Sequence, residues 1–492
     1  MSTPRPAAVI ILAAGEGTRM KSDTPKVLHR IGGRSLVGHA IAAAREVGAE
    51  HLSVVVRHKR ELVAPHVTEI DPAALIADQD EVKGTGRATE CGLDVLPADL
   101  TGTVLVTMGD VPLLTGETLV ALTREHESTG AAVTVVTSQL DDALSYGRIV
   151  RDADGSVERI VEFKDATEEE KAITEINSGI YAFDVAVLRE ALAQVTTDNA
   201  QGEKYLTDVL GIARAAGRRV SAHLLEDLWQ TEGINDRVQL ARLGAELNRR
   251  MCEKWMREGV TIVDPASTWI DVDATFGRDV TILPGTQILG PSVVGARAVI
   301  GPEVTLEATE VGEDAEVRRA EAHHAVIGAG ASVGPYSYLR PGTELGAGGK
   351  IGGFVETKNA KIGDGAKVPH LTYCGDAVIG EGANIGAGTI FANYDGVTKG
   401  QTVVGAQSFV GSQSVLVAPV SIADGAYVAA GSTITGEVGP GQLAVARGKQ
   451  RNIDHWVARR RAGTKTDEAA RAAGYADAGS TTQGTTDTKD NA

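Results

Sequence analysis

The sequence predicts a doubly wound, Rossmann-like α/β domain followed by a parallel β-helix of hexapeptide repeats. The chain has 492 residues, more than one hydrophobic core usually organises, so at least two domains are expected. Over residues 1–237, short β-branched runs alternate with helical stretches, as strands and crossover helices do in an α/β domain. From residue 276 onwards, aliphatic residues recur at every sixth position, the period of one face of a β-helix coil.

Seven short apolar runs in the first domain are predicted to be strands. Five of them should form one sheet: residues 8–12, 52–56, 103–107, 132–137 and 180–183. The other two, residues 148–150 and 157–161, flank the turn sequence DADG, which predicts a hairpin added to that sheet.

A long amphipathic helix is predicted to link the two halves of the chain. Five large apolar residues there follow one another at spacings of three and four: Leu240, Leu243, Leu247, Met251 and Trp255. The expected boundaries are 1–237 for the α/β domain, 238–258 for the linker helix and 259–461 for the β-helix. The tail, residues 462–492, has almost no large apolar residues and is predicted to be disordered.

The hexapeptide period predicts a coil with three short faces, in which one inward aliphatic residue stacks on those above and below. Residues 393–401 interrupt the phase and should form a loop that projects from the coils. The repeat predicts a scaffold rather than an activity. The in-phase positions are Phe276, Ile282, Ile288, Val294, Ile300, Leu306, Ile327, Val333, Leu339, Leu345, Ile351, Val404, Val410, Leu416, Ile422, Val428 and Ile434.

Composition and charge exclude several classes of protein. Hydrophobic residues make up 42% of the chain, too many for a wholly disordered protein. The net charge is −17 and no basic stripe is interleaved with aromatic residues, so nucleic-acid binding is not expected. Three scattered cysteines indicate neither a disulfide framework nor a zinc site, as in the reducing cytoplasm. No apolar run reaches the roughly twenty residues that span a bilayer, so no membrane insertion is expected.

A glycine-containing loop, LAAGEGTRM, follows the first predicted strand. Gly15 and Gly17 would let backbone N–H groups approach phosphate oxygens, and Arg19 and Lys26 would supply positive charge. Met20 stands where a dinucleotide fingerprint has its third glycine, which argues against a nicotinamide cofactor. Lys26 alone would be an ordinary solvated lysine; the whole motif indicates a site for nucleotide phosphates.

Asp110 follows the apolar strand at 103–107, at the carboxyl end where ligands of open α/β sheets bind. A carboxylate there suits Mg²⁺, which prefers oxygen ligands and binds substrate phosphates. The alternative is an aspartate that only caps a turn before Pro112.

The motif LAAGEGTRM with the following PKVL resembles the signature of sugar-nucleotide pyrophosphorylases. To about residue 460 the chain resembles the bifunctional N-acetylglucosamine-1-phosphate uridyltransferase / glucosamine-1-phosphate N-acetyltransferase family. This resemblance implies an α/β nucleotidyltransferase domain, a left-handed β-helix, and a role in making UDP-N-acetylglucosamine for peptidoglycan and the cell envelope. It also implies four substrates: glucosamine-1-phosphate, acetyl-CoA, N-acetylglucosamine-1-phosphate and UTP.

For uridylyl transfer, the resemblance implies in-line attack of a sugar phosphate on the α-phosphorus of UTP, with charge neutralised by Arg19, Lys26 and Mg²⁺. Asp110 and Asn235 would hold the metal, although Asn235 alone reads as the N-cap of the linker helix. The residues implied to bind the nucleotide and sugar are Leu12, Ala13, Ala14, Gly15, Lys26, Gln79, Gly84, Thr85, Gly147, Glu162, Asn177 and Asn235.

Acyl transfer from a thioester to an amine needs a base for the ammonium proton and donors for the oxyanion. His370 follows an inward-facing valine and should be accessible; by itself it would be a surface histidine without a role, as His323 and His324 are taken to be. Its match to the family's base assigns it that role. The resemblance places the acceptor sugar phosphate on Arg340, Lys358, Tyr373, Asn384 and Lys399. It places acetyl-CoA on Ala387, Asn393, Tyr394, Ser412, Ala430 and Arg447, and implies a homotrimer.

Two alternatives remain on the sequence alone. A hexose-1-phosphate pyrophosphorylase with a regulatory β-helix would lack the group around His370, which this chain has. Scaffold subunits of a translation-factor exchange complex share the domain pair but need neither the glycine-containing loop nor Lys26 and Asp110, all of which are present.

Overall fold

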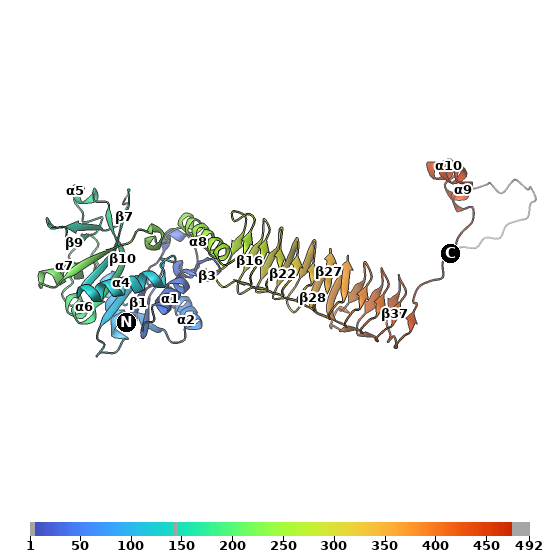
Figure 1. Ribbon diagram of the computed structural model, residues 1–492, viewed down its shortest axis with the longest axis horizontal. Helices are drawn as coiled ribbons and strands as arrows, with labels where there is room; N and C mark the ends of the chain where they lie inside the picture. The colour runs from blue at the N-terminus through green and yellow to red at the C-terminus, as the bar shows by residue number, and fades with distance from the viewer. Residues whose placement is uncertain (1–4, 142, 144–145, 475–492) are drawn as a thin grey trace, which may run out of the picture.

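The computed structural model describes residues 5–141, 143 and 146–474. The chain forms an elongated molecule, with an α/β domain at one end, a straight prism of short strands, and a small helical segment beyond the prism (Figure 1). The long helix α8 (Arg237–Arg257) lies where the two large parts meet.

A mixed nine-stranded sheet forms the centre of the α/β domain, in the order β11-β7-β10-β6-β1-β4-β5 with β8 and β9 beside β10. Strand β1 is parallel to β4 and β6, whereas β10 is antiparallel to β6 and β7. The strands are β1 (Ala8–Leu12), β4 (His51–Val56), β5 (Leu75–Asp78), β6 (Thr103–Met108), β7 (Val133–Gln139), β8 (Arg148–Arg151), β9 (Val157–Val161), β10 (Glu175–Asp184) and β11 (Val220–Leu224).

Helices cover both faces of this sheet, which explains why β1 is apolar throughout. Alternate residues of β1 enter two different cores: Ile10 packs with α3 (Thr85–Asp94) on one face, and Ile11 packs with α1 (Leu36–Glu46) on the other. The other helices of the domain are α2 (Arg60–Ile70), α4 (Gly116–Thr129), α5 (Glu168–Lys171), α6 (Val185–Leu192) and α7 (Asp208–Ala215). Two buried faces are the pattern of a doubly wound sheet.

The predicted hairpin is also present. Strand β8 pairs antiparallel with β9 and joins the sheet through β10, with the turn sequence DADG between the two strands.

Helix α8 contributes side chains to the cores of both large parts of the chain. Leu243 is fully buried in a cluster with Ile31, Leu113 and Ile234 of the α/β domain. About two turns later, Met251 and Cys252 belong to the core of the prism. The helix is capped by Asp236, whose carboxylate accepts a hydrogen bond from Gln239 N, so the reading of Asn235 as the N-cap was off by one residue.

The prism runs from β12 (Thr261–Ile262) to β39 (Leu443–Ala444), and its strands pair in parallel with those of the next coil. Ile282 lies opposite Ile300, three hexapeptides later, so each coil has three faces. All the in-phase aliphatic residues are buried except Phe276, which is partly buried against the same core. The predicted fold class, an α/β nucleotidyltransferase domain followed by a left-handed parallel β-helix, is confirmed.

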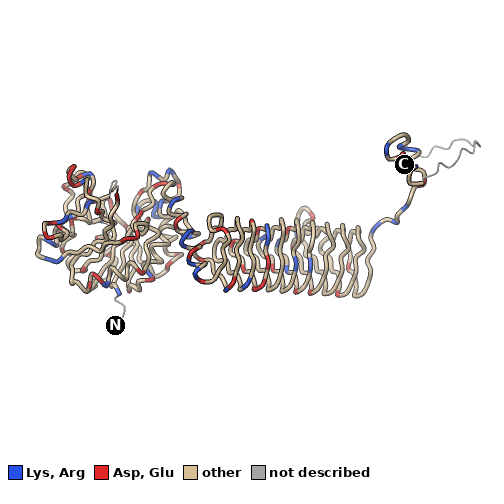
Figure 2. Tube along the Cα trace, turned by 45° about the horizontal axis from the view of Figure 1, so that its top comes forward, with Lys and Arg blue, Asp and Glu red and all other residues tan. Residues whose placement is uncertain are grey.

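A short hairpin interrupts the coils between β32 (Ile390–Ala392) and β33 (Thr402–Val404), as the break in the repeat predicts. Tyr394 and Lys399 face each other across it in an antiparallel bridge. A loop projecting from the otherwise regular coils is visible in Figure 2.

The tail differs from the sequence-based expectation. Two helices, α9 (Trp456–Arg460) and α10 (Lys465–Ala472), lie beyond the prism, so the prediction of disorder from residue 462 is wrong for the described part. Helix α10 is stabilised locally, because Thr464 caps it, Asp467 lies in its first turn and Arg471 in its last. Such a helix needs no large apolar core. Residues 475–492 of the predicted disordered tail lie outside the described residues.

Candidate active sites

A cavity of about 440 Å³ opens at the carboxyl ends of β1 and β6. Most of the residues predicted to bind the nucleotide line it: Leu12, Ala13, Ala14, Gly15, Lys26, Gln79, Gly84 and Thr85, with Asp110 at one side. The glycine loop therefore lies where the motif places it, next to the positive charge of Lys26.

Backbone constraints explain one glycine that lines this cavity, Gly84, and one in the adjacent loop, Gly17. Gly17 has φ +64°, and a Cβ there would lie 2.5 Å from the Lys26 Cβ, so the glycine lets the lysine lie against the loop. Gly84 has φ +112°, and its Cβ would lie 2.2 Å from the carbonyl oxygen of Lys204. The start of α3 can therefore pack against the backbone of Lys204 only because residue 84 is a glycine.

Lys26, Asp110 and Asn235 converge although they are far apart in sequence. The Lys26 ammonium forms an ion pair with the Asp110 carboxylate and donates to Asn235 Oδ1 at 3.3 Å. A backbone hydrogen bond from Ile234 N to the Asp110 carbonyl oxygen, at 2.9 Å, holds the two segments together. Asn235 N in turn donates to Gln239 Oε1 of α8 at 2.7 Å.

The oxygens of Asp110 and Asn235 suit magnesium. No group of three or more His, Cys, Asp or Glu residues that could hold a metal occurs in the described part of the chain. One carboxylate and one amide oxygen fit Mg²⁺, because this ion usually takes one or two carboxylates and completes its shell with water and substrate phosphates.

A second cavity, of about 480 Å³, adjoins the first, and Asp110 and Met108 line both. Arg19 lies in this second cavity, together with Asn235 and Tyr146. Lys26 and Arg19 therefore lie in different cavities on either side of Asp110. This arrangement suits two substrates, one in each cavity, whose phosphates come together near Asp110.

Gly147, Glu162 and Asn177 lie side by side near Tyr146. Asn177 N donates to the carbonyl oxygen of Gly147 at 2.9 Å, and a Cβ on Gly147 would lie 3.5 Å from Glu162 Oε2. Burial raises the pKa of Glu162. Asn177 Oδ1 accepts hydrogen bonds from Gly179 N and Tyr181 Oη, so its side chain is held in one orientation.

On the prism, Lys358 and Lys399 form a pair with like charge. The side-chain contact and the charge of Lys399 lower the pKa of Lys358, and the Arg340 guanidinium adds to this effect. Arg340 also donates to Glu356 at 3.1 Å. Three cations beside one another, from β28 (Glu356–Ile362), the preceding coil and the projecting hairpin, favour an anionic ligand.

Tyr373 and Asn393 complete this surface. Strand β30 (Tyr373–Ile379) pairs with β28, so that Tyr373 lies opposite Glu356 and Lys358 opposite Gly375. A Cβ on Gly375 would lie 2.4 Å from Tyr373 Oη and 2.9 Å from Asn393 Nδ2. The glycine therefore lets both polar groups lie over the strand.

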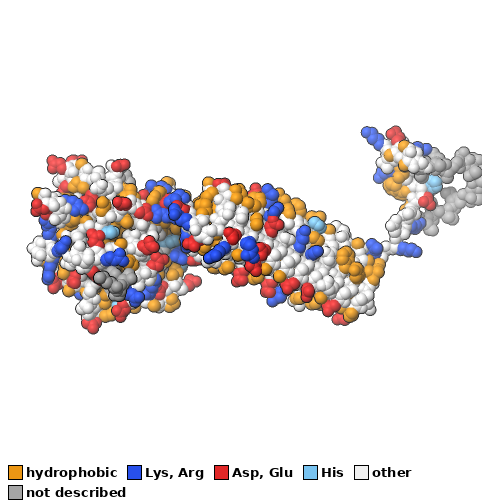
Figure 3. Space-filling view, in the orientation of Figure 1, with side chains coloured by type: hydrophobic (Ala, Val, Ile, Leu, Met, Phe, Trp, Pro, Cys, Tyr) orange, Lys and Arg blue, Asp and Glu red, His pale blue; other side chains and the backbone are white. Residues whose placement is uncertain are grey.

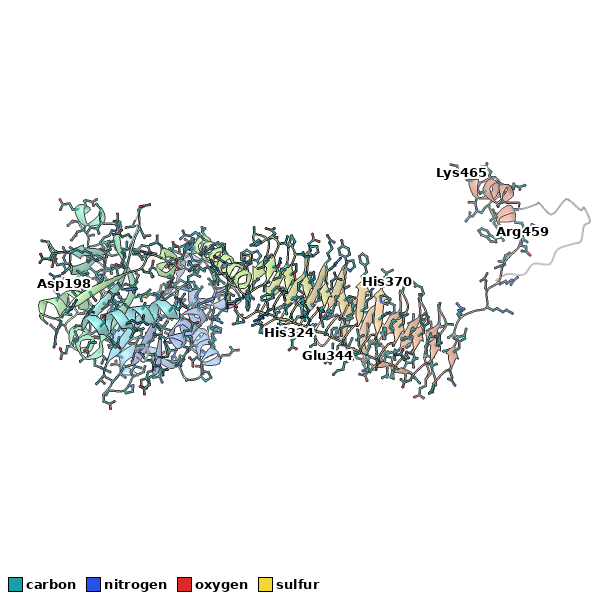
Figure 4. All side chains as sticks on the ribbon, viewed as in Figure 1. Asp198, His324, Glu344, His370, Arg459 and Lys465 are labelled. Carbon is teal, nitrogen blue, oxygen red and sulfur yellow. The ribbon has the colours of Figure 1, made fainter. Side chains whose placement is uncertain are left out.

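His370 ends β29 (Lys367–His370) on the adjoining face of the prism, and Figure 4 shows it at the outer surface. Its side chain is exposed and has no hydrogen-bond partner among the described residues. Its carbonyl oxygen accepts from Gly388 N at 3.1 Å, which brings Ala387 next to it. Asn384 begins the strand that follows β29 in the sheet, opposite Lys367.

Four of the residues predicted to hold coenzyme A form a column up one edge of successive coils, whereas Asn393 and Tyr394 lie on the projecting hairpin. Gln413 N donates to the Ala387 carbonyl oxygen, Gly431 N to that of Ser412, and Arg447 Nη1 to that of Ala430, each at 2.8 Å. Ser412, Ala430 and Arg447 are exposed. An extended ligand that starts at His370 could therefore follow this edge towards the C-terminal end of the prism.

Known proteins resemble this chain along nearly its whole length. Residues 9–217 match the MobA-like NTP transferase domain family. The "Bifunctional protein GlmU" of Pseudarthrobacter chlorophenolicus is 59% identical, over 95% of this chain and 96% of the relative. The protein of the same name from Micrococcus luteus is 57% identical, over 96% of this chain and 98% of the relative.

The chain belongs to the bifunctional GlmU family. This membership confirms the family recognised in the sequence and the predicted enzyme, a bifunctional uridylyltransferase and N-acetyltransferase. Among solved structures, one titled UDP-glucose pyrophosphorylase complexed with UDP-glucose has 20% identity and a TM-score of 0.37, covering 45% of this chain and 91% of that one. That similarity is too weak to support an argument. No helix in the described part of this GlmU-family chain is long and apolar enough to cross a membrane.

Sequence reasoning missed several charged residues of the two cavities. Arg57, Lys83 and Glu203 line the first, and Glu232 and Arg242 line the second. Lys83 directly precedes the predicted Gly84, so its position offered a signal. Glu232 and Arg242 flank Asn235 at the start of α8, and only the fold shows that this helix end closes the second cavity.

Proposed function

We propose that the chain makes UDP-N-acetylglucosamine in two consecutive steps. The prism would transfer an acetyl group from acetyl-CoA to glucosamine-1-phosphate, and the α/β domain would transfer UMP from UTP to the product, releasing pyrophosphate. The observation that supports this most strongly is the convergence of Lys26, Asp110 and Asn235 where two cavities meet.

In uridylyl transfer, an oxygen of the sugar phosphate attacks the α-phosphorus of UTP and pyrophosphate leaves. The first cavity would take the nucleotide, with Gln79, Gly84 and Thr85 on its wall. Bound Mg²⁺, held by Asp110 and Asn235, would neutralise phosphate charge. Lys26 would exchange its contact with Asp110 for phosphate oxygens, and Arg19 would approach from the second cavity.

The sugar would lie in the second cavity and extend towards the hairpin β8–β9. Gly147, without a side chain, leaves room beside Glu162, and the fixed amide of Asn177 offers its Nδ2 donor to the N-acetyl group. These assignments rest on the family resemblance and on the contacts among the three residues.

In acetyl transfer, the amine nitrogen attacks the thioester carbon, the C–S bond breaks, and the amine's proton must leave. His370 would accept that proton, since its imidazole is exposed and has no partner among the described residues. Arg340, Lys358 and Lys399 would bind the sugar phosphate, with Tyr373 beside them. Asn384 and Ala387 would hold the acetyl end.

The edge formed by Ser412, Ala430 and Arg447 would bind the remainder of coenzyme A, with the Arg447 guanidinium on a phosphate. Asn393 and Tyr394 of the projecting hairpin would contact the same ligand from the side.

A homotrimer is supported by a column of exposed apolar side chains next to His370. Tyr336, Phe354 and Leu371 are 58%, 63% and 59% exposed at the same corner of successive coils. The rings of Tyr336 and Phe354 stack at 5.2 Å. Figure 3 shows hydrophobic side chains exposed along the prism. Apolar patches of this kind suit subunit contacts, which would complete the acetyl-transfer site.

The two activities would divide along the chain as the sequence predicts, with uridylyl transfer in 1–237, a linker helix over 238–258 and acetyl transfer in 259–461. The proposed substrates UTP and acetyl-CoA favour a cytoplasmic enzyme, and its product would feed peptidoglycan and the cell envelope. Neither proposed reaction uses a nucleic acid or a membrane.

The experiment that tests the whole proposal incubates the full chain with glucosamine-1-phosphate, acetyl-CoA, UTP and Mg²⁺. UDP-N-acetylglucosamine should form. Without acetyl-CoA no UDP-N-acetylglucosamine should form, and adding N-acetylglucosamine-1-phosphate should restore its formation. EDTA should stop the second step and spare the release of CoA thiol. Formation of a different sugar nucleotide, or none from N-acetylglucosamine-1-phosphate and UTP, would contradict the proposal.

A further inference from the structure

Asp376 lies in the middle of the cationic surface on the prism, where the charges of Lys358 and Lys399 act on its carboxylate. It belongs to β30 and has φ +49°, the positive φ that many corner residues of the prism share, among them Asn359 one coil earlier at +44°.

The carboxylate of Asp376 is shared by two asparagines. Asn359 Nδ2 donates to Oδ1 at 2.8 Å, and Asn393 Nδ2 donates to Oδ2. Partial burial alone would raise the pKa of Asp376, but these hydrogen bonds and the charges of Lys358 and Lys399 keep it below its usual value. The carboxylate is therefore ionised, and both of its oxygens are used.

The contact with Asn393 is important because Asn393 lies at the base of the projecting hairpin. Gly400 N donates to the Asn393 carbonyl oxygen at 2.9 Å, which closes the hairpin at its base. Beyond this base the side chains bond within the hairpin: Asp395 accepts from Val397 N, Thr398 N and Thr398 Oγ1, and Tyr394 Oη donates to Gly396 O.

The hairpin is thus a small internally bonded unit, and the Asn393–Asp376 hydrogen bond attaches its base to the wall of the prism. Lys399 and Tyr394 are carried by this unit, whereas Lys358 and Arg340 belong to the wall. The position of the hairpin cation relative to the wall cations therefore depends on the contact that fixes the base of the hairpin. Lys358 and Lys399 carry like charges and repel each other. Without a carboxylate nearby, this repulsion would push the hairpin away from the wall.

We propose that Asp376 is a positioning residue for acetyl transfer, which anchors the 393–400 hairpin and holds Lys399 beside Lys358 for the sugar phosphate. This inference rests on the proposed function of the prism. It assigns to Asp376 the placement of cations and no contact with reacting atoms, so its loss should weaken binding of the sugar phosphate more than it slows the chemical step.

The test compares Asp376→Asn and Asp376→Ala with a matched variant, Asp364→Asn. Asp364 is another aspartate of the prism, exposed where Asp376 is half-buried, and its carboxylate accepts from Ala347 N at 2.8 Å, away from the hairpin. Two readouts are needed: steady-state acetyl transfer, with KM for glucosamine-1-phosphate separated from kcat, and hydrogen–deuterium exchange of residues 393–400. Uridylyl transfer in the same proteins reports that the chain is folded.

In Asp376→Asn one of the two amide donors loses its acceptor, and a charge-assisted hydrogen bond disappears. KM for glucosamine-1-phosphate should rise about tenfold, with a smaller change in kcat, and amide exchange across 393–400 should accelerate. Asp376→Ala should show both effects more strongly, and Asp364→Asn neither.

Unchanged KM and unchanged hairpin exchange in both Asp376 variants would overturn the inference. So would a fall in kcat without a rise in KM, which would place Asp376 in the chemical step. If the wild-type chain lacked acetyl transfer, the proposed function would fail, yet faster hairpin exchange in Asp376→Asn would still support the anchor.

Discussion

At the scale of single residues, Asp110 carries the most specific expectation for the α/β domain. Asp110→Asn keeps the size of the side chain and removes its charge, which weakens a Mg²⁺ site formed by one carboxylate and one amide. We expect uridylyl transfer to fall roughly tenfold to hundredfold at low Mg²⁺, with partial recovery at high Mg²⁺. Initial rates over a Mg²⁺ titration measure this, and acetyl transfer in the same protein is the control. An unchanged Mg²⁺ dependence would remove Asp110 from the metal site.

His370 carries the corresponding expectation for the prism. His370→Ala should lower kcat for acetyl transfer by roughly 10²–10⁴-fold, the range for a lost acid–base group, and leave uridylyl transfer unchanged. A suitable control is His324→Asn, since His324 is another exposed histidine of the prism (Figure 4). Asparagine tolerates the φ of +47° that His324 has. Near-normal kcat in His370→Ala would mean that solvent, rather than His370, takes the amine proton.

Individual residues also show where sequence reasoning reaches its limit. Lys26 and Asp110 could be chosen from their motifs, but their ion pair joins residues 84 apart in sequence, and Lys26 contacts Asn235 across 209 residues. The sequence allowed two roles for Asn235, as a metal ligand or as the N-cap of the linker helix. The structure gives the capping role to Asp236 and leaves Asn235 Oδ1 facing Lys26.

At the scale of elements, periodic patterns predicted strands and coils well. Both faces of β1 and the inward positions of the prism are buried, and burial requires apolar residues at these positions in the sequence. The ends of elements were less predictable. Strand β10 begins at Glu175, five residues before the predicted run, since its polar residues are buried by pairing with β7 and β8 rather than by apolar packing. Helix α10 was missed because local capping, not a core, stabilises it.

Two glycines offer a matched test of element geometry. Gly84→Ala would place a Cβ 2.2 Å from the Lys204 carbonyl oxygen at a φ of +112°, so the start of α3 must shift. We expect KM for UTP to rise and the protein to lose about 1–3 kcal/mol of stability. Gly211→Ala, in α7 with nothing within 4 Å of its Cβ, should instead gain about 0.5–1 kcal/mol. Calorimetry and UTP kinetics measure both; equal effects of the two substitutions would contradict this reading.

At the scale of the whole molecule, the sequence predicted two parts and a helix between them, but not how closely the helix is shared. Arg34 of the α/β domain pairs with Asp273 of the prism at 2.6 Å, and Val272 N donates to the Gly32 carbonyl oxygen at 3.0 Å. Contacts between segments this far apart carry no local pattern. These contacts join the two parts directly, and helix α8 adds buried side chains to both cores, which affects where the chain can be divided.

The division can be tested with two fragments, residues 1–237 and 1–257. Both contain the residues proposed for uridylyl transfer and neither contains the prism, so both should transfer UMP and lack acetyl transfer. The shorter fragment loses Leu243, which is fully buried against the α/β domain, and loses Gln239, whose Oε1 accepts from Asn235 N. Removing the buried leucine should cost about 2–5 kcal/mol of stability, as truncation of a large apolar core residue does.

Losing Gln239 frees the backbone that presents Asn235, so the shorter fragment should also need more Mg²⁺ for half-maximal uridylyl transfer. Thermal unfolding and a Mg²⁺ titration of both fragments separate the two effects, because a leucine contributes nothing to the metal site. Matching Mg²⁺ requirements would show that α8 supports the domain without orienting Asn235. A folded 1–257 fragment without uridylyl transfer would show instead that the prism supplies something this reaction needs, and the proposed division of the two activities would be wrong.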